Sequence, residues 1–173
     1  MSDLAAYIRT VPDFPKKGIG FKDITTLLKD AAAFKKSLDE MQKQFPDQVD
    51  IVVGIESRGF IFGSALAERY GAGFVPARKP GKLPAEVVRE EYELEYGTDQ
   101  LEMHRDAIQP GQKVLIVDDL LATGGTAAAT ARLVEKLGGE IRGILFLIEL
   151  SFLNGRDKLR DYPVASIIQY HTE

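Results

Sequence analysis

Short apolar runs alternate with amphipathic segments along most of the chain. The run at 50–55 is continuous and rich in β-branched residues. Such a run is typical of a strand that is buried on both faces, as in a parallel sheet. Further runs of this kind occupy 73–76, 113–117, 141–148 and 164–168. The pattern therefore predicts a sheet of mainly parallel strands.

The segments between these runs have helical spacing. After Asp30, apolar residues recur at steps of four, three and four, at Phe34, Leu38, Met41 and Phe45. This spacing predicts a one-sided helix that ends near position 46. Helices are also predicted at 59–70 and 126–137, each followed by glycine. Strands that alternate with helices predict a doubly wound α/β fold, with helices on both sides of the sheet.

One segment departs from this alternation. Tyr92, Leu94 and Tyr96 alternate with glutamates, a turn is predicted at 97–99, and apolar alternation then resumes. This pattern predicts a β-hairpin. Because the insertion is acidic and lies between two sheet strands, we expect it to form a flap over one edge of the sheet and no part of the core.

Composition narrows the class of protein. The 173 residues are 45% hydrophobic and 28% charged, as in soluble globular domains. The absence of cysteine excludes disulfides and thiolate metal sites, and it favours a reducing cytoplasm. No apolar run is long enough to span a bilayer, so no membrane partner is expected. The net charge of −4 disfavours a nucleic-acid partner, because binding nucleic acid usually requires a basic face.

The most informative motif follows the predicted strand at 113–117. Asp118 and Asp119 are expected at the end of that strand, where ligands bind in open α/β sheets. Small and hydroxyl residues then lead into a helix. Glycines let backbone N–H groups close around an anion, and the helix N-terminus adds partial positive charge. The residues predicted to hold a phosphate are Ala122, Thr123, Gly124, Gly125 and Thr126.

The two aspartates indicate which phosphate compound binds. A triphosphate-binding loop of the common type requires a lysine, and this loop has none. Two carboxylates would repel a polyphosphate, whereas they are good acceptors for sugar hydroxyls. A ribose with its 5-phosphate in the loop satisfies both halves of the motif. A strand–turn–helix junction with acidic capping residues and no ligand is the alternative.

Residues 114–126 resemble the signature of type I phosphoribosyltransferases, which bind 5-phosphoribosyl-1-pyrophosphate. The resemblance implies that Asp118 and Asp119 hold the ribose hydroxyls and that 122–126 holds the 5-phosphate. It also implies Mg²⁺ as a cofactor held mainly by substrate oxygens, and a homodimer. The whole chain, 1–173, is then one phosphoribosyltransferase domain with a hood at 1–30 and a mobile flap at 78–104.

Two further segments match the pyrophosphate site of this family. Ser57 and Arg58 follow the first long apolar run, and arginine is a fork-shaped donor suited to anions. The segment from Arg78 to Lys82 places three cations among turn-forming residues. On the residues alone, an arginine that caps a helix and a solvated charge run remain the alternatives. The resemblance implies that Ser57, Arg58, Arg78, Lys79 and Lys82 bind pyrophosphate.

The N-terminal segment bears on the acceptor base. A short helix capped by Ser2 is predicted there, followed by a proline-rich loop. Residues 13–25 are similar to the base-recognition segment of the family members that act on adenine. This resemblance implies that the purine stacks on Phe21, with edge contacts from Gly20 and Lys22. A hydrophobic plug beneath the first helix is the alternative.

The hairpin segment at 91–97 resembles the mobile catalytic loop of the same enzymes. The resemblance implies that Glu95 and Tyr96 approach the reacting centre, with Asp118 and Asp119 as the other catalytic residues. Without it, alternating glutamates are typical of a solvated hairpin edge that resists aggregation. The expected reaction joins adenine to the phosphoribosyl group and gives AMP and pyrophosphate, as in purine salvage.

Two rival functions remain open. The first is a phosphoribosyltransferase for another base, such as hypoxanthine, guanine, xanthine or orotate, which would share residues 114–126 and differ in the base pocket. The second is a non-catalytic regulator that senses ribose phosphate and binds RNA. The acidic charge balance and the presence of Glu95 and Tyr96 disfavour the second.

Overall fold

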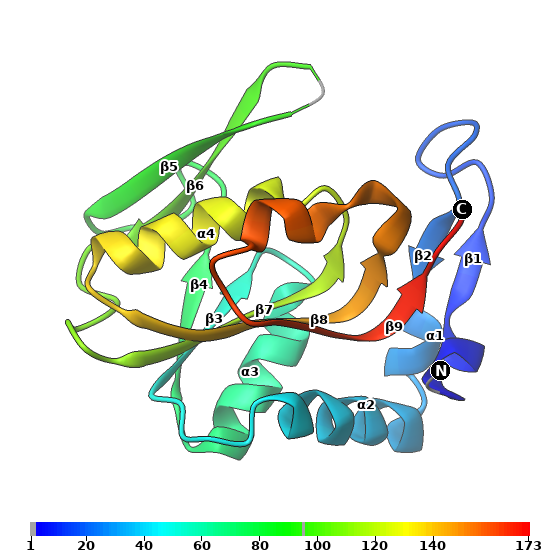
Figure 1. Ribbon diagram of the computed structural model, residues 1–173, viewed down its shortest axis with the longest axis horizontal. Helices are drawn as coiled ribbons and strands as arrows, with labels where there is room; N and C mark the ends of the chain where they lie inside the picture. The colour runs from blue at the N-terminus through cyan, green and yellow to red at the C-terminus, as the bar shows by residue number, and fades with distance from the viewer. Residues whose placement is uncertain (1–2, 95) are drawn as a thin grey trace.

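A five-stranded parallel sheet forms the centre of the molecule (Figure 1). The computed structural model describes residues 3–94 and 96–173. The strand order is β4–β3–β7–β8–β9, and each neighbouring pair runs parallel. The strands are β3 (Ile51–Ile55), β4 (Gly73–Ala77), β7 (Lys113–Leu121), β8 (Glu140–Leu150) and β9 (Val164–Tyr170). Each of the five apolar runs lies in one of these strands, so the predicted parallel sheet is confirmed.

Helices cover both faces of the sheet, which confirms the doubly wound α/β fold (Figure 1). On one face lie α2 (Ala31–Gln44), preceded by the single turn α1 (Thr25–Leu28), and α3 (Gly59–Tyr70). On the other face lies α4 (Gly125–Lys136). Asp30 caps α2 by accepting a hydrogen bond of 2.9 Å from the Ala33 N–H. Gly71 ends α3 at a φ of 66°, the left-handed conformation that glycine adopts readily.

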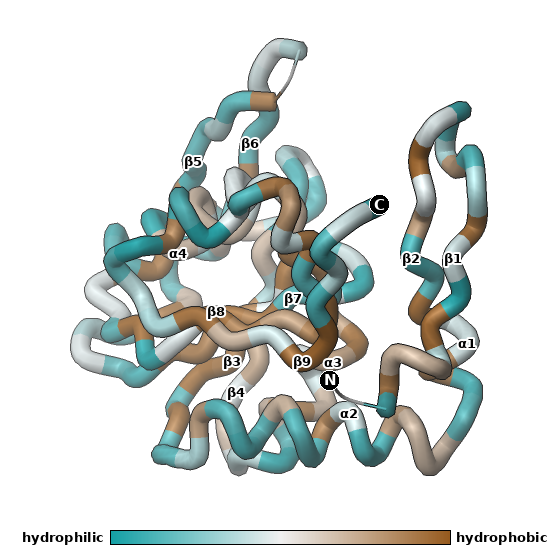
Figure 2. The backbone as a smooth tube through the Cα atoms, turned by 45° about the vertical axis from the view of Figure 1, so that its right-hand side comes forward, coloured by the Kyte–Doolittle hydropathy of each residue, from teal (hydrophilic) through white to brown (hydrophobic). Residues whose placement is uncertain are grey.

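The central strand β7 contributes side chains to both hydrophobic cores, one on each face of the sheet. Val114 and Ile116 face the core beneath α4, whereas Leu115 and Val117 face the core beneath α2 and α3. All four side chains are fully buried. Figure 2 shows the hydrophobic residues concentrated along the sheet strands. Burial on both faces explains why these strands appear in the sequence as continuous apolar runs.

The predicted hairpin consists of β5 (Val87–Glu93) and β6 (Thr98–His104). The prediction that it contributes nothing to the core is wrong. Tyr92, Leu101 and Met103 are buried and pack in the core beneath α4. The turn also lies earlier in the chain than predicted, because β5 ends at Glu93 and β6 already begins at Thr98. The hairpin therefore has one face anchored in the core, while its tip extends away from the sheet (Figure 1).

The N-terminal hood contains elements too short to predict from periodicity. Its first helix is the 3₁₀ helix η1 (Asp3–Tyr7), and Ser2, the predicted cap, lies outside the described residues. A two-stranded antiparallel sheet follows, made of β1 (Arg9–Val11) and β2 (Phe21–Asp23). The C-terminal tail adds η2 (Ser151–Leu153) and η3 (Gly155–Leu159) before β9. Within residues 3–94 and 96–173, no helix combines the length and the apolar character needed to span a membrane.

Candidate active site

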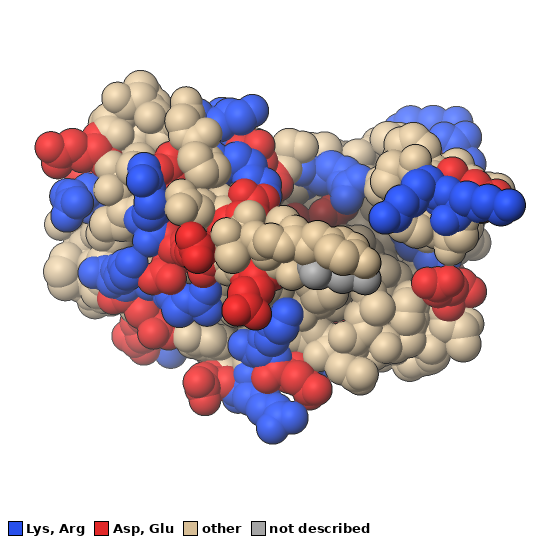
Figure 3. All heavy atoms as spheres, turned by 90° about the horizontal axis from the view of Figure 1, so that it is seen from above, with Lys and Arg blue, Asp and Glu red and all other residues tan. Residues whose placement is uncertain are grey.

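A cavity of about 300 Å³ opens at the carboxyl edge of the sheet, next to the ends of β3 and of its pairing with β7. Seen from above, acidic and basic side chains meet in the hollow between the β5–β6 hairpin and the hood (Figure 3). The cavity thus brings predicted ribose and pyrophosphate residues together around one space. Its lining residues are Ile55, Glu56, Ser57, Arg58, Lys79, Leu101, Asp118, Asp119, Leu120 and Thr126.

The two predicted ribose aspartates lie within β7 and not at its end. The prediction that this strand stops at 117 is wrong, because β7 remains paired with β8 as far as Leu121. Its pairing with β3 stops at Val117. One side of β7 is therefore already open at Asp118 and Asp119 while the other side is still held in the sheet, which fixes the backbone that carries both carboxylates.

Each aspartate has a defined environment. Asp119 is only 5% exposed, and its Oδ2 lies 2.7 Å from the Nε of Arg58. The Asp118 Oδ1 accepts a hydrogen bond of 2.8 Å from the Asp119 N–H. A Cβ at Gly59 would lie 2.9 Å from that same Oδ1. The glycine at the start of α3 therefore leaves the space that the Asp118 carboxylate occupies.

The environment of Asp118 predicts that the stability of the protein depends on pH. Burial and the neighbouring Asp119 raise the pKa of Asp118 well above its ordinary value of 3.8. Asp118 therefore makes its full contribution to stability at pH values below its pKa in the unfolded state. This contribution is lost as the pH rises through the raised pKa of the folded state. We expect Asp118→Asn, which cannot ionise, to raise the melting temperature relative to wild type at about pH 8 but not at about pH 4. Thermal unfolding at both pH values measures this, and an equal difference at both would contradict it.

The predicted phosphate loop surrounds a second, smaller cavity of about 80 Å³. Ala122, Thr123, Gly124 and Thr126 line it, and α4 begins at Gly125. Gly124 precedes the helix at a φ of 86°, in the left-handed region. The first backbone N–H groups of a helix lack partners within the helix, so this start of α4 offers donors to an anion. The loop has the geometry of the predicted phosphate site, and phosphate binding stays a prediction.

The C-terminal tail packs against this loop, a contact that no pattern in the sequence predicts. A Cβ at Gly124 would lie 2.4 Å from the carbonyl oxygen of Gly155, and a Cβ at Gly155 would lie 2.4 Å from the carbonyl oxygen of Ala122. Both backbones thus approach each other more closely than any side chain permits. Gly155 begins η3, so the tail packs directly behind the phosphate loop.

Arg58 connects the predicted ribose site with the predicted base site. Besides its ion pair with Asp119, its guanidinium lies 5.0 Å from the ring centre of Phe21. Phe21 is half-buried and also makes an edge contact with Phe14, with 5.1 Å between ring centres. A purine can stack on the face of Phe21 that Arg58 covers only after the guanidinium has moved away.

The cationic segment from Arg78 to Lys82 surrounds the carboxylate of Glu56, a residue for which the sequence predicts no role. The Glu56 Oε1 accepts hydrogen bonds from the Arg78 Nε at 3.0 Å and from the Lys79 N–H at 3.1 Å. Its Oε2 lies 3.9 Å from the Lys82 Nζ. Burial opposes ionisation of Glu56, but the bonds from Lys79 and Arg78 outweigh it and lower its pKa. Of the three predicted pyrophosphate cations here, Lys79 lines the larger cavity.

The predicted base segment is divided between two sides of the hood. Gly20 and Phe21 lie where β2 begins, and Phe21 faces Arg58. Lys22 instead donates a hydrogen bond of 3.1 Å to the Thr10 Oγ1, and its Nζ lies 4.3 Å from the ring centre of Tyr170. The Lys22 side chain therefore links the hood to β9, and its predicted contact with the base stays a prediction.

Of the two predicted loop residues, Tyr96 lies at the tip of the hairpin. Glu95 lies outside the described residues, so its predicted role stays a prediction. Tyr96 is 86% exposed and does not line the cavity. The predicted approach of Tyr96 to the reacting centre therefore stays a prediction.

Comparison with known proteins assigns the chain to a family. The family model of the phosphoribosyl transferase domain matches residues 21–169 of the sequence. This range includes the residues that line the larger cavity, the phosphate loop and the cationic segment. The chain therefore belongs to the phosphoribosyltransferase family, and the predicted family is confirmed.

Individual relatives place it more closely. The adenine phosphoribosyltransferase of Alkaliphilus metalliredigens is 62% identical over 97% of this chain and 99% of its own length. That of Acetivibrio thermocellus is 61% identical with the same coverage. The crystal structure of adenine phosphoribosyltransferase from Thermoanaerobacter pseudethanolicus has a TM-score of 0.94 and 57% identity, covering 97% of this chain and 98% of its own. Within the family, the chain groups with these adenine phosphoribosyltransferases.

Proposed function

We propose that the protein transfers the 5-phosphoribosyl group of 5-phosphoribosyl-1-pyrophosphate to adenine, giving AMP and pyrophosphate. One observation carries the donor half of this reaction: paired aspartates, the start of α4, Arg58 and Lys79 meet at adjoining cavities. The acceptor half rests on the relatives. The Saccharomyces cerevisiae enzyme, 44% identical with a TM-score of 0.90 over 95% of this chain and 96% of its own, was solved with D-2,5-dideoxy-2,5-imino-altritol 1,6-bisphosphate and adenine.

The residues divide the work as follows. Asp118 and Asp119 accept hydrogen bonds from the ribose hydroxyls and favour the positive charge that develops on the sugar. The bond from the anomeric carbon to pyrophosphate breaks with its electron pair on the leaving oxygen, and N9 of adenine forms the new bond and loses its proton. Arg58 and Lys79 stabilise the charge on the leaving group. Holding both substrates in the geometry required for reaction can supply about 7–11 kcal/mol of the barrier reduction.

Mg²⁺ is proposed as the cofactor. Among the described residues, no group of three His, Asp or Glu side chains could hold a metal ion. Asp118 and Asp119 still offer two carboxylates at the ribose position, and carboxylate oxygens are ligands that Mg²⁺ accepts. The ion would therefore take most of its oxygen ligands from pyrophosphate and ribose. When bound, it would neutralise charge on the leaving group.

Glu95 is proposed to accept a proton from the purine, since the resemblance implies that it approaches the reacting centre. We expect Glu95→Gln to lower kcat by about 100-fold, the lower range for loss of a general base, with little change in KM for adenine. Single-turnover kinetics at saturating substrate measure the chemical step. If KM rises while this step keeps its rate, Glu95 binds the base and does not move a proton.

A panel of bases tests the proposed function. Purified protein with the donor and Mg²⁺ should release pyrophosphate with adenine and be inactive with hypoxanthine, guanine, xanthine and orotate. Turnover of one of those bases in place of adenine would favour the first rival function. No turnover of any base, with tight RNA binding at physiological salt, would favour the second.

The remaining parts of the resemblance are proposed together: a homodimer acting in the cytoplasm in purine salvage. They rest on the resemblance, and the chain matches the adenine phosphoribosyltransferase relatives over nearly their full length. Size-exclusion chromatography with light scattering tests the dimer, and a single-chain mass at micromolar concentration would exclude it.

A further inference from the structure

Lys79 lines the larger cavity, yet its ammonium is held from outside the cavity, by the hairpin. Its Nζ donates a hydrogen bond of 2.7 Å to the hydroxyl of Tyr92 and pairs with the carboxylate of Asp99. The same Nζ lies 5.4 Å from the centre of the Tyr92 ring. The backbone N–H of Lys79 is separately bound to Glu56. Both ends of this flexible residue are therefore fixed.

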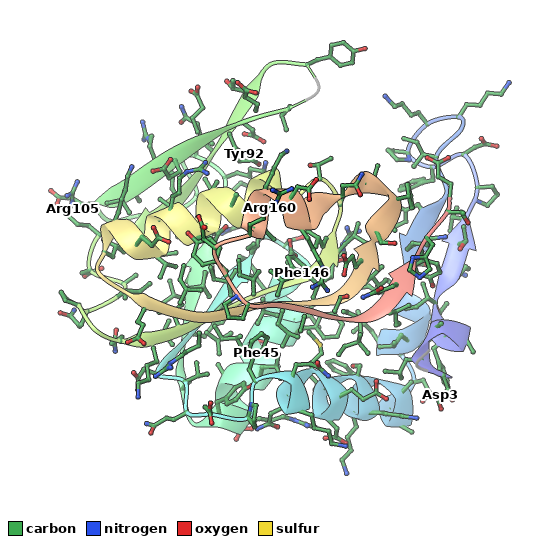
Figure 4. The ribbon with its side chains drawn as sticks, in the orientation of Figure 1. Asp3, Phe45, Tyr92, Arg105, Phe146 and Arg160 are labelled. Carbon is green, nitrogen blue, oxygen red and sulfur yellow. The ribbon has the colours of Figure 1, made fainter. Side chains whose placement is uncertain are left out.

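The two hairpin groups are themselves held in place. Tyr92 and Asp99 face each other across the β5–β6 pairing, and the Tyr92 hydroxyl lies 3.3 Å from the Asp99 Oδ2. The other oxygen, Oδ1, accepts a 2.8 Å hydrogen bond from the Gln100 N–H. The Tyr92 ring is buried between the hairpin and the start of α4, and Figure 4 shows it beneath the hairpin. The bonds from Lys79 and from the Gln100 backbone lower the pKa of Asp99, so the Asp99 carboxyl is charged at neutral pH.

A lysine ammonium has three N–H donors, and two of them have partners among the residues that the structure describes. The Asp99–Tyr92 pair therefore orients Lys79 without consuming its binding capacity. An unrestrained lysine would lose rotamer freedom on binding an anion, whereas this one has already lost much of it. From this geometry we propose that Asp99, together with Tyr92, is a positioning residue that presents Lys79 to the pyrophosphate group of the donor. The proposal rests on the proposed function, because that function places pyrophosphate in this cavity.

The arrangement joins the cationic segment to the hairpin at more than one point. Arg78 forms a two-way backbone bridge with Glu102 of β6, and the Gly81 N–H donates to the buried Glu102 carboxylate at 2.9 Å. These contacts hold the segment at the base of the hairpin, whereas the Lys79–Asp99 contact lies nearer the tip. Asp99 can therefore be removed without detaching the segment from its anchor.

The test is a double-mutant cycle on Asp99 and Lys79. We expect Asp99→Ala to raise KM for 5-phosphoribosyl-1-pyrophosphate about fivefold, as for a partly exposed charge pair combined with lost side-chain order. KM for adenine should not change. Asp99→Asn keeps an acceptor oxygen and should recover most of the loss. In a Lys79→Met background, Asp99→Ala should have no further effect.

Direct binding and a matched control complete the test. Calorimetry with inorganic pyrophosphate should show the same ranking of affinity, wild type above Asp99→Ala. Asp106→Ala removes an exposed carboxylate just after β6 and should match wild type. If the Asp99 and Lys79 effects simply add, or if Asp99→Asn is as impaired as Asp99→Ala, the positioning role is wrong. Absence of adenine turnover in the wild type would instead overturn the proposed function, and the pyrophosphate titration would still decide the role of Asp99.

Discussion

Replacing both aspartates of β7, Asp118→Asn with Asp119→Asn, is expected to lower kcat/KM for the donor by about 1,000-fold. Each substitution removes a charged acceptor from a ribose hydroxyl, and a hydrogen bond to a charged group contributes about 1.5–3 kcal/mol. Two such losses correspond to about two to four powers of ten in rate. Steady-state kinetics with varied donor and saturating adenine measure the effect.

The fold should survive this double substitution. Asparagine has nearly the same shape as aspartate, and removing the ionisable Asp118 relieves the cost of its burial. Asp161→Asn, an exposed aspartate of the tail, provides the matched control and should keep wild-type activity. Circular dichroism checks the fold. Undiminished turnover by the double variant would refute the assignment of these residues to ribose.

Gly124→Ala is expected to produce the second large effect, in stability as well as in donor binding. The new Cβ would lie 2.4 Å from the Gly155 carbonyl oxygen, and the residue would be held at a φ of 86°. Left-handed strain and overpacking together are expected to lower the free energy of unfolding by about 2–4 kcal/mol. The loop must shift to relieve the clash, so KM for the donor should rise by at least about tenfold.

A second glycine separates strain from the clash. Gly111 has the same φ of 86°, but a Cβ there would meet nothing within 4 Å. Gly111→Ala should therefore cost only the conformational strain, about 1–2 kcal/mol, and leave KM unchanged. Chemical denaturation and donor kinetics on both variants provide the comparison. Equal losses of stability in the two would contradict the contact between the loop and the tail.

Sequence periodicity predicts the elements whose burial is one-sided or complete. The helix at 59–70 is predicted correctly because Gly71 marks its end, and the strand at 50–55 because both of its faces are apolar. The short strands β1 and β2 have three residues each, which is too few for a periodic signal. The burial of one face of the hairpin is not predicted, because glutamates alternate with the apolar residues that form this face. Alternation reveals a hairpin, but the sequence does not show what that hairpin packs against.

The candidate site was predictable to the extent that its residues lie close together in the chain. Asp118 and the loop that follows it form one continuous segment, so the order of residues in the sequence indicates their chemistry. Lys79 and Asp99, or Gly124 and Gly155, meet only through the fold. Lys22 is a further case: the sequence does not indicate that its side chain contacts Thr10 and Tyr170. Side-chain direction depends on these distant partners.

The contact between Gly124 and Gly155 also has a consequence for how the protein is made. During synthesis the strand β7 and its loop leave the ribosome before the tail does. The backbone that packs behind the loop is absent until residue 155 has emerged, and β9 follows later still. The predicted phosphate loop therefore gains its supporting contact late in translation. A nascent chain that stops before the tail should lack donor affinity even though every residue of the binding motif has been made.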